Sequence, residues 1–428
     1  MAWSNQSKEY EKLLEIGRPP NIASLFPNSK GLIVSGKFID RALTAKGKAM
    51  TIAANGRNHL IIRGVLAAAQ KADAAVIIEI AKSEGGSSFY CSVNYWNMAR
   101  QVDAVLNELG LTVPVAIHAD HYGIKNDKDL AKAKVEVPTM FEAGITSIAI
   151  DASHLPDDQN LLASIAVNPF IPKWAGLECE VGEIKGDVGL STPAEALFLV
   201  QGLNAHDIHP DWIALNNGTT HGIQASSAGI NVDLTAEIHK AIAPYGLSGA
   251  QHGTSGNSSE RLKEIALKTR TTKANVATAL QMVSWGVEID DYGNAILKDG
   301  ALVKIPGQGM TEELWAEMVA FGADKKYKAG DFKNLNLPFE NKILSQPKEI
   351  RERMTKAVED FVYNLLTKVF SADGTAKLTY EAIMKAGGCD PGPKASRLED
   401  PANWTEAKIK EKAAAINTDK GPAGNFDD

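Results

Sequence analysis

Apolar and polar positions follow a repeating pattern along most of the chain. Eight short apolar runs have the character of buried strands, and each is followed by a stretch whose apolar residues recur at helical spacing. Several of these stretches begin at Ser, Thr or Asp and end at Gly, as helices do. The predicted strands cover residues 49–55, 74–81, 113–120, 147–153, 176–182, 212–218, 246–253 and 272–278.

Eight such alternations in about 230 residues predict an α/β protein built on a (β/α)8 TIM barrel with a C-terminal helical extension. A doubly wound open sheet also alternates strands and helices. That fold has fewer strands, however, and carries a glycine-rich phosphate loop after the first one, which "ANGRN" does not resemble.

The remaining pattern divides the chain into four parts. Residues 1–45 form an N-terminal helical segment, residues 46–300 the catalytic barrel, and residues 301–375 helices that pack on the barrel or on a partner subunit. The Gly- and Pro-rich composition beyond these helices predicts an extended tail over residues 376–428, with at best a short solvated helix inside it.

Composition narrows the class of protein. The chain has 428 residues, of which 44% are hydrophobic and 23% charged, as in an ordinary soluble globular protein. A net charge of -7 disfavours nonspecific nucleic-acid binding, which needs a basic surface. Three scattered cysteines suit neither a disulfide framework nor a thiolate metal site. Without a signal-peptide pattern or a long apolar run, we expect a cytoplasmic protein that does not bind membranes.

Polar side chains gather where the predicted strands end. In a barrel these ends converge on one mouth, so residues distant in sequence become neighbours there. Carboxylates two positions apart on a strand share a face, and imidazoles from three strands suit zinc with one coordination position open. The polar positions are His118, Asp120, His121, Asp151, Ser153, Glu178, Glu180, His221, His252, Asn275 and Thr278.

Two further motifs lie between or after the predicted strands. "HDIHP", with His206 and His209, has metal-like spacing but precedes the sixth strand, which favours a surface turn at the opposite end of the barrel. "HGTSGNSSE" and "NVAT" follow the last two strands, where barrels commonly bind phosphate, and they offer small residues and backbone N–H groups. A metal and a phosphate would therefore share one pocket.

These residues carry a family resemblance. The motifs "HADH", "DASHLP", "LECEVG", "NNGTTHG", "SGAQHGTSG" and "TKANVAT" resemble, in order and spacing, those of class II, zinc-dependent fructose-1,6-bisphosphate aldolases and related ketose-bisphosphate aldolases. The resemblance runs from about residue 45 to 285, and more weakly to about 370. It implies reversible cleavage of fructose 1,6-bisphosphate to dihydroxyacetone phosphate and glyceraldehyde 3-phosphate, by a homo-oligomer, either a dimer or a tetramer.

The resemblance also implies roles for single residues. His121, His221 and His252 would bind zinc, with Glu180 and Asp151 around the metal, and Asp120 would move a proton at the aldehyde-derived oxygen. Dihydroxyacetone phosphate, with a monovalent cation (K⁺ or Na⁺) beside it, would be bound by Gly222, Gly253, Ser255, Asn275 and Thr278. The second phosphate would be bound by Asn55 and Ser83.

Three positions depart from the family pattern. Val188 stands where a glutamate base is expected after the fifth strand, so Asp187 or Glu183 would have to replace it. Ala277 stands where fructose-bisphosphate enzymes often have Asp, as it does in tagatose-type aldolases. Lys348 is the nearest match to an arginine that binds the second phosphate, and lysine lacks the bidentate guanidinium geometry.

Two other functions remain open at this point. A barrel metallohydrolase could use clustered His and Asp to activate water, but that class typically opens with a His-x-His pair on its first strand, and "AMTIAAN" has none. A non-catalytic barrel protein would have little reason to keep the His and Asp set together. Within "HADH", the deeper His118 is expected to support the site by hydrogen bonding rather than to bind metal.

Overall fold

The computed structural model describes residues 7–86, 89–182, 189–219, 229–290 and 293–416. Its centre is a closed barrel of eight parallel strands, in which each strand pairs with the next and β8 pairs with β1. The predicted (β/α)8 barrel is therefore confirmed, and every predicted strand overlaps an observed one. The strands are β1 (Thr51–Asn55), β2 (Val76–Ala81), β3 (Val115–Gly123), β4 (Ser147–Asp151), β5 (Gly176–Val181), β6 (Trp212–Leu215), β7 (Ser248–Gln251) and β8 (Thr271–Val276).

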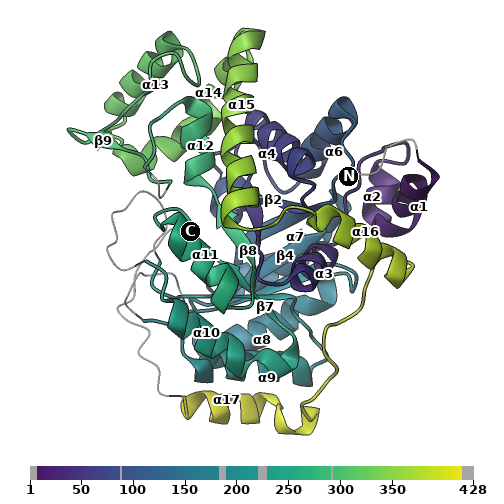
Figure 1. The fold of residues 1–428 in the computed structure, drawn as a ribbon. Helices are drawn as coiled ribbons and strands as arrows, with labels where there is room; N and C mark the ends of the chain where they lie inside the picture. The colour runs from purple at the N-terminus through teal and green to yellow at the C-terminus, as the bar shows by residue number, and fades with distance from the viewer. Residues whose placement is uncertain (1–6, 87–88, 183–188, 220–228, 291–292, 417–428) are drawn as a thin grey trace.

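Helices surround this barrel and cover its apolar outer surface (Figure 1). Most begin at a capping side chain; for example, Thr192 and Glu195 form a reciprocal capping box at the start of α9. The surrounding helices are α4 (His59–Ala72), α5 (Lys82–Gly85), α6 (Met98–Leu109), α7 (Asp127–Glu142), α8 (Asp157–Val167), α9 (Pro193–Ala205), α10 (Val232–Ala241), α11 (Ser259–Lys268) and α12 (Thr278–Trp285), with 3-10 turns η1 (Asn168–Phe170) and η2 (Ala243–Tyr245).

One helix of the N-terminal segment, α3 (Gly36–Lys46), covers the amino ends of the barrel strands. The segment also contains α1 (Lys8–Gly17) and α2 (Pro20–Leu25). A Cβ atom on Gly36 would lie 2.6 Å from Ser147 Oγ, so only glycine allows α3 to approach the start of β4 this closely. Because α3 lies across the amino ends of the strands, access to the barrel interior is from their carboxyl ends.

A C-terminal region packs on the outer face of the helices that surround the barrel. In Figure 1, α13, α14 and the β9 hairpin form a lobe above α12, and α15 runs down from it beside α4. The elements are β9 (Leu297–Lys298), β10 (Ala301–Leu302), α13 (Glu312–Asp324), η3 (Ala329–Leu335), α14 (Asn336–Leu344), α15 (Lys348–Asn364), the π-helical turn η4 (Leu365–Val369), α16 (Thr375–Ala386), η5 (Pro401–Asn403) and α17 (Glu406–Ala414).

The prediction of an extended tail from residue 376 is wrong for its first part. Residues 376–386 continue α16, because Ala376, Tyr380 and Ile383 recur at helical spacing and are buried in the main core. The Gly- and Pro-rich stretch that suggested extended chain begins only after this helix. Further along, Lys394 Nζ lies 2.5 Å from Asp40 Oδ2 on α3, which holds the tail against its own barrel.

Candidate active site

A bulge in β3 places two consecutive side chains in the barrel mouth. In a regular strand Asp120 and His121 would point to opposite faces. The pairing with β4 shifts register between Ala119 and Tyr122, and His121 has a φ of 43°, which is uncommon outside glycine. As a result the candidate ligand atoms of Asp120, His121 and His252 lie within 4.8 Å of one another, close enough to share one metal ion. Such local strain is typical of functional sites.

His121 and His252 are linked through their ring nitrogens to carboxylates on β4 and β5. His252 Nε2 lies 2.8 Å from Glu178 Oε1. His121 Nδ1 lies 3.1 Å from Glu180 Oε1 and 3.4 Å from Asp151 Oδ2. Since a carboxylate accepts hydrogen bonds, these contacts place the proton of each ring on the nitrogen that faces the carboxylate.

The other two ring nitrogens face each other across the mouth. His252 Nδ1 and His121 Nε2 are 2.5 Å apart, and by the proton positions above both are lone-pair nitrogens. Two lone pairs at this separation repel each other unless a proton or a cation lies with them. Carboxylate oxygens of Asp120, Asp151 and Glu180 lie within 4.8 Å of a ring nitrogen of His121 or His252, so they could share a metal ion with these histidines. The donor set therefore suits a divalent metal that accepts imidazole and carboxylate ligands.

Lys273 on β8 lies deeper in the barrel and interacts with three carboxylates. Its Nζ is 2.8 Å from Glu178 Oε2, 3.2 Å from Glu79 Oε2 and 3.5 Å from Asp120 Oδ1, and its side chain is fully buried. Burial alone would lower the pKa of Lys273, but Glu178 and Glu79 outweigh it and raise the pKa above its usual value. Burial and the nearby Asp120 raise the pKa of Glu79.

The position of the Lys273 ammonium group favours one of two candidate metal sites over the other. Glu79, His118 and Asp120 are close enough together to hold a metal, but Lys273 already lies beside two of them and would repel a second cation. His118 has a supporting position as expected, because its Nδ1 is 2.7 Å from Ser147 Oγ. The ligand group at His121 and His252 is therefore the better metal site among the described residues.

Asp120 has contacts of its own. Asn275 Nδ2 donates to Asp120 Oδ1 at 2.9 Å, and Tyr95 Oη donates to the Asp120 carbonyl at 2.9 Å. Burial alone would raise the pKa of Asp120, but His121 and Lys273 outweigh this and lower the pKa below its usual value. Asp120 is therefore held as an oriented carboxylate beside the candidate metal site.

The predicted phosphate positions fall on loops and helix starts around the same mouth. Gly253 has a φ of 58°, in the loop that follows β7 and continues to Ser255, and Thr278 is the first residue of α12. Asn55 ends β1, and Ser83 Oγ is buried without a hydrogen bond to the described residues. Polar hydrogen atoms and backbone N–H groups at helix starts suit an anion.

Other predicted residues are not brought to this mouth or cannot be placed. The Lys348 side chain is 80% exposed at the start of α15, where its Nζ lies 3.6 Å from Glu352 Oε1, so the structure does not bring it to the site. His206 and His209 lie on the turn before β6, as expected. The positions that lie outside the described residues are Glu183, Asp187, Val188, His221 and Gly222.

Sequence reasoning missed two buried cations. One is Lys273; the other is Arg57, whose Nε lies 2.7 Å from Glu84 Oε1 just after β1. Glu84 Oε2 in turn accepts from Asn55 Nδ2 at 2.6 Å, so Arg57 helps to hold a candidate phosphate residue. For Lys273 the available signal was a charged residue inside a predicted strand, the Lys of "TTKANV", since such a residue is buried only with partners.

Most of the sequence matches a known protein family. The family model "Fructose-bisphosphate aldolase class-II" matches residues 38–373. The chain belongs to the class II fructose-bisphosphate aldolase family. It is accordingly a class II aldolase, a lyase, from a family that acts on phosphorylated sugars. Within the described residues, this aldolase has no helix long and apolar enough to cross a bilayer.

Individual relatives show how far the similarity extends. The aldolase is 30% identical over 232 residues to a fructose-bisphosphate aldolase of Streptococcus pneumoniae, covering 53% of this chain and 73% of the relative. It is 28% identical over 239 residues to that of Staphylococcus epidermidis, covering 54% of this chain and 76% of the relative. Each match therefore spans about half of this chain and about three quarters of the relative.

Solved structures extend the similarity in fold. The YdjI aldolase of Escherichia coli K12 superposes with a TM-score of 0.53 at 19% identity, over 81% of this chain and 100% of its own. The fructose-bisphosphate aldolase of Campylobacter jejuni gives a TM-score of 0.53 at 16% identity, over 80% of this chain and 97% of its own. At these identities the similarity concerns the fold alone.

Proposed function

We propose that this aldolase catalyses the zinc-dependent, reversible cleavage of fructose 1,6-bisphosphate to dihydroxyacetone phosphate and glyceraldehyde 3-phosphate. The observation that carries the proposal is the pair of facing nitrogens, His121 Nε2 and His252 Nδ1, with the oriented carboxylate of Asp120 beside them. Membership of the class II family supports the same reaction.

Zinc would be held by His121, His252 and His221, with Glu180 and Asp151 as neighbouring acidic groups. Imidazoles on one face and carboxylates behind them are the donors that catalytic zinc sites use. When bound, the ion supplies Lewis-acid stabilisation of the negative charge that develops as the carbon–carbon bond next to the ketone breaks. Glu178 holds His252 in the required tautomer through the 2.8 Å contact at Nε2.

Asp120 moves the proton of the aldehyde half. In cleavage its carboxylate takes the proton from the hydroxyl that becomes the aldehyde oxygen, and in condensation it returns that proton. Asn275 Nδ2 donates to Oδ1 at 2.9 Å, which leaves Oδ2 as the oxygen that exchanges the proton. We assign the proton exchange on the dihydroxyacetone phosphate half to Asp187, because Val188 has no acid–base group.

Phosphate groups position the substrate on both sides of the mouth. Gly222, Gly253, Ser255 and Thr278 would bind the phosphate of the dihydroxyacetone half, with K⁺ or Na⁺ beside it. Asn55 and Ser83 would bind the second phosphate. Lys348 is left out of this set because its side chain is exposed and already faces Glu352.

One residue favours a second candidate substrate, tagatose 1,6-bisphosphate. Ala277, directly after β8, replaces an acidic residue that fructose-bisphosphate enzymes often have. Loss of a charged group beside the substrate changes which hydroxyl arrangement is stabilised, and the two ketoses differ in the configuration of one hydroxyl. The two substrates therefore have to be compared directly.

The decisive experiment measures cleavage of both bisphosphates by the purified protein, before and after removal of metal with a chelator, and again after zinc is restored. We expect activity to disappear on chelation and to return with zinc. Activity that survives complete metal removal, or that is trapped by borohydride as a lysine adduct, would contradict the zinc mechanism. Equal loss of activity in Asp187→Asn and Glu183→Gln would contradict the assignment of Asp187.

A further inference from the structure

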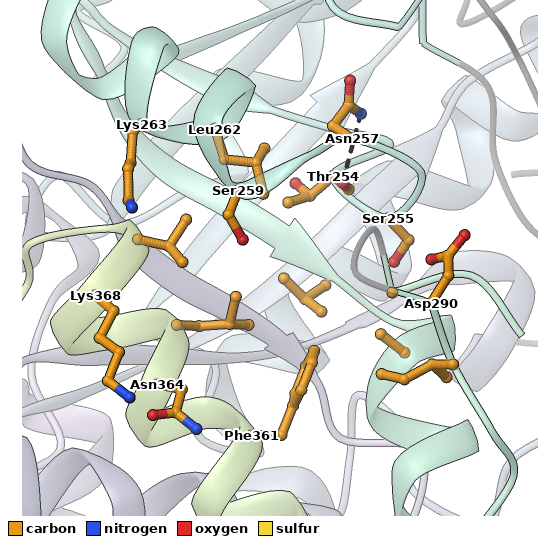
Figure 2. Close-up of a pocket in the computed structure, with 16 residues that line it drawn as sticks. Thr254, Ser255, Asn257, Ser259, Leu262, Lys263, Asp290, Phe361, Asn364 and Lys368 are labelled. Carbon is orange, nitrogen blue, oxygen red and sulfur yellow. Dashed lines mark hydrogen bonds between the residues drawn. The ribbon is translucent and has the colours of Figure 1, made fainter.

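A groove outside the barrel lies between α11, α12 and the C-terminal end of α15. Its volume is about 500 Å³, within the range of small-molecule sites. Figure 2 shows its lining, with Lys263 of α11 and Lys368 of η4 at one end and Ser255 and Asp290 at the other. The loop after β7 forms part of its lining, whereas the residues clustered around His121 do not line it.

The floor of the groove is apolar. Side chains from α11, β8, α12, the segment after α12 and the α15–η4 junction form it: Leu262, Val276, Ala279, Ile289, Phe361, Leu365 and Val369. A polyhydroxylated sugar would lose hydrogen bonds to water on such a surface without replacing them. The floor therefore suits an aliphatic or aromatic body better than the sugar substrate.

The charges at the rim are unbalanced. The side-chain ammonium groups of Lys263 and Lys368 form no ion pair or hydrogen bond with the described residues. The acidic side chain at the other end, Asp290, accepts from Asn294 N at 2.9 Å, so it is engaged in its own turn. One end of an apolar groove thus presents two uncompensated ammonium groups, which is complementary to an anion.

The backbone supports the same conclusion. Leu365, Lys368 and Val369 all belong to the π-helical turn η4, and all three line the groove. Such turns are rare and occur frequently at functional sites, since they give up regular hydrogen bonding. Here the turn brings the Lys368 ammonium and two apolar side chains to the same cavity.

We propose that this groove binds a small organic anion with an apolar body, and that its occupancy is coupled to the phosphate loop after β7. Thr254, Ser255 and Asn257 of that loop form one wall of the groove. Asn257 Nδ2 donates to the Gly253 carbonyl at 3.0 Å, while its Oδ1 accepts from Ile230 N at 3.0 Å. A ligand that contacts Asn257 therefore acts on the loop that carries Gly253.

The coupling rests on the proposed function, in which Gly253 and Ser255 bind the substrate phosphate, but the binding site itself does not. Energetic coupling between two sites is reciprocal, so phosphate at the loop must change the affinity of the groove by the same factor that the groove ligand changes phosphate affinity. The two parts can be tested in one titration series.

The probe is anilinonaphthalene sulfonate, an aromatic anion whose fluorescence rises in apolar sites, and phenylnaphthylamine is its uncharged counterpart. We expect saturable binding of the sulfonate to the folded holoenzyme. The double variant Lys263→Gln, Lys368→Gln should weaken it by about five- to tenfold and leave the uncharged probe unaffected, since each exposed ion pair contributes modestly. Asn364→Trp, at the exposed rim, should fill the groove and abolish binding of both probes.

A matched control uses lysines far from the groove, and each contrary result would overturn a different part of the proposal. Lys377→Gln with Lys410→Gln removes two exposed lysines from other helices and should leave sulfonate binding unchanged. Equal sulfonate binding by wild type, the groove double variant and Asn364→Trp would overturn the site. Groove-dependent binding that inorganic phosphate leaves unchanged would keep the site and overturn its coupling to the loop. Absence of aldolase activity would contradict the proposed function and not the groove.

Discussion

Lys273 Nζ lies 2.8 Å from Glu178 Oε2, and neither side chain is exposed to solvent. The other oxygen of Glu178 is 2.8 Å from His252 Nε2, so a lysine on β8 fixes the carboxylate that orients a candidate metal ligand after β7. Loss of a contact that orients a metal ligand typically lowers metal affinity by about 10- to 100-fold.

Replacing Lys273 by methionine should destabilise the fold. The variant keeps most of the side-chain volume but removes the cation that lies between Glu79, Glu178 and Asp120. Breaking a buried ion pair from one side costs about 3–5 kcal/mol, because the remaining charge has no partner. Urea unfolding of the metal-free protein measures this directly. Lys377→Met on the surface of α16 is the control and should shift stability by about 0.5 kcal/mol or less.

A rescue experiment separates charge from packing. Adding Glu178→Gln to Lys273→Met removes the uncompensated carboxylate, so the double variant should lose less stability than the sum of the two single variants. If Lys273→Met is as stable as wild type, the ammonium group does not hold these carboxylates together.

Glu178→Gln alone should weaken zinc binding by about 10- to 100-fold while the protein stays folded. A glutamine amide cannot satisfy both neighbours: its oxygen can face the His252 N–H, but its NH₂ group then faces the Lys273 ammonium. Competition with a chromophoric chelator measures the affinity, and circular dichroism checks the fold. Unchanged zinc affinity would show that His252 needs no support from Glu178.

Asp120→Asn should retain zinc and reduce turnover by about 10²-fold or more, as expected when a general acid–base group is lost. The amide can still interact with Asn275 after that side chain reorients, so the local structure should persist. Metal analysis and steady-state cleavage rates are measured on the same sample. Asp299→Asn, at an exposed turn with a φ of 51° that Asn tolerates, should keep full activity. Loss of zinc from Asp120→Asn would mean that Asp120 is a ligand.

Much of the fold and part of the site could be predicted because their signals are local. The eight apolar runs mark the strands, and His121, Asp120 and His252 stand next to strand ends, where a barrel brings chemistry together. Lys273 was not predicted, since its burial depends on carboxylates from β2, β3 and β5 that only the closed barrel brings within reach.

Other features depend on packing that leaves no local pattern. The bulge at His121 is a backbone distortion, and its sequence, "HADH", reads as a regular strand end. Lys348 follows a proline at a helix start and matches a family position, but the direction of α15 carries it into solvent. The helix α16 was obscured by the glycines and prolines that follow it.

Protonation of His239 should make the protein less stable in acid. Burial, with a smaller contribution from Arg270, lowers the pKa of His239 to about 3, while its pKa in the unfolded chain is about 6.5. Between these values the unfolded chain binds the extra proton and the folded protein does not, so the stability contribution is lost as pH falls below about 6.5. Acidification from pH 6.5 to 4 should therefore cost about 3 kcal/mol at this residue.

His239→Asn tests this because the asparagine oxygen can replace His239 Nδ1 as the acceptor for Arg270 N, a contact of 3.2 Å, without titrating. The free energy of unfolding is measured in urea from pH 4 to 7 for both proteins. Titration of the candidate metal site contributes equally to both, so the difference between their slopes isolates His239. Parallel curves for wild type and His239→Asn would show that His239 is protonated in the folded protein, or that its surroundings relax to admit the charge.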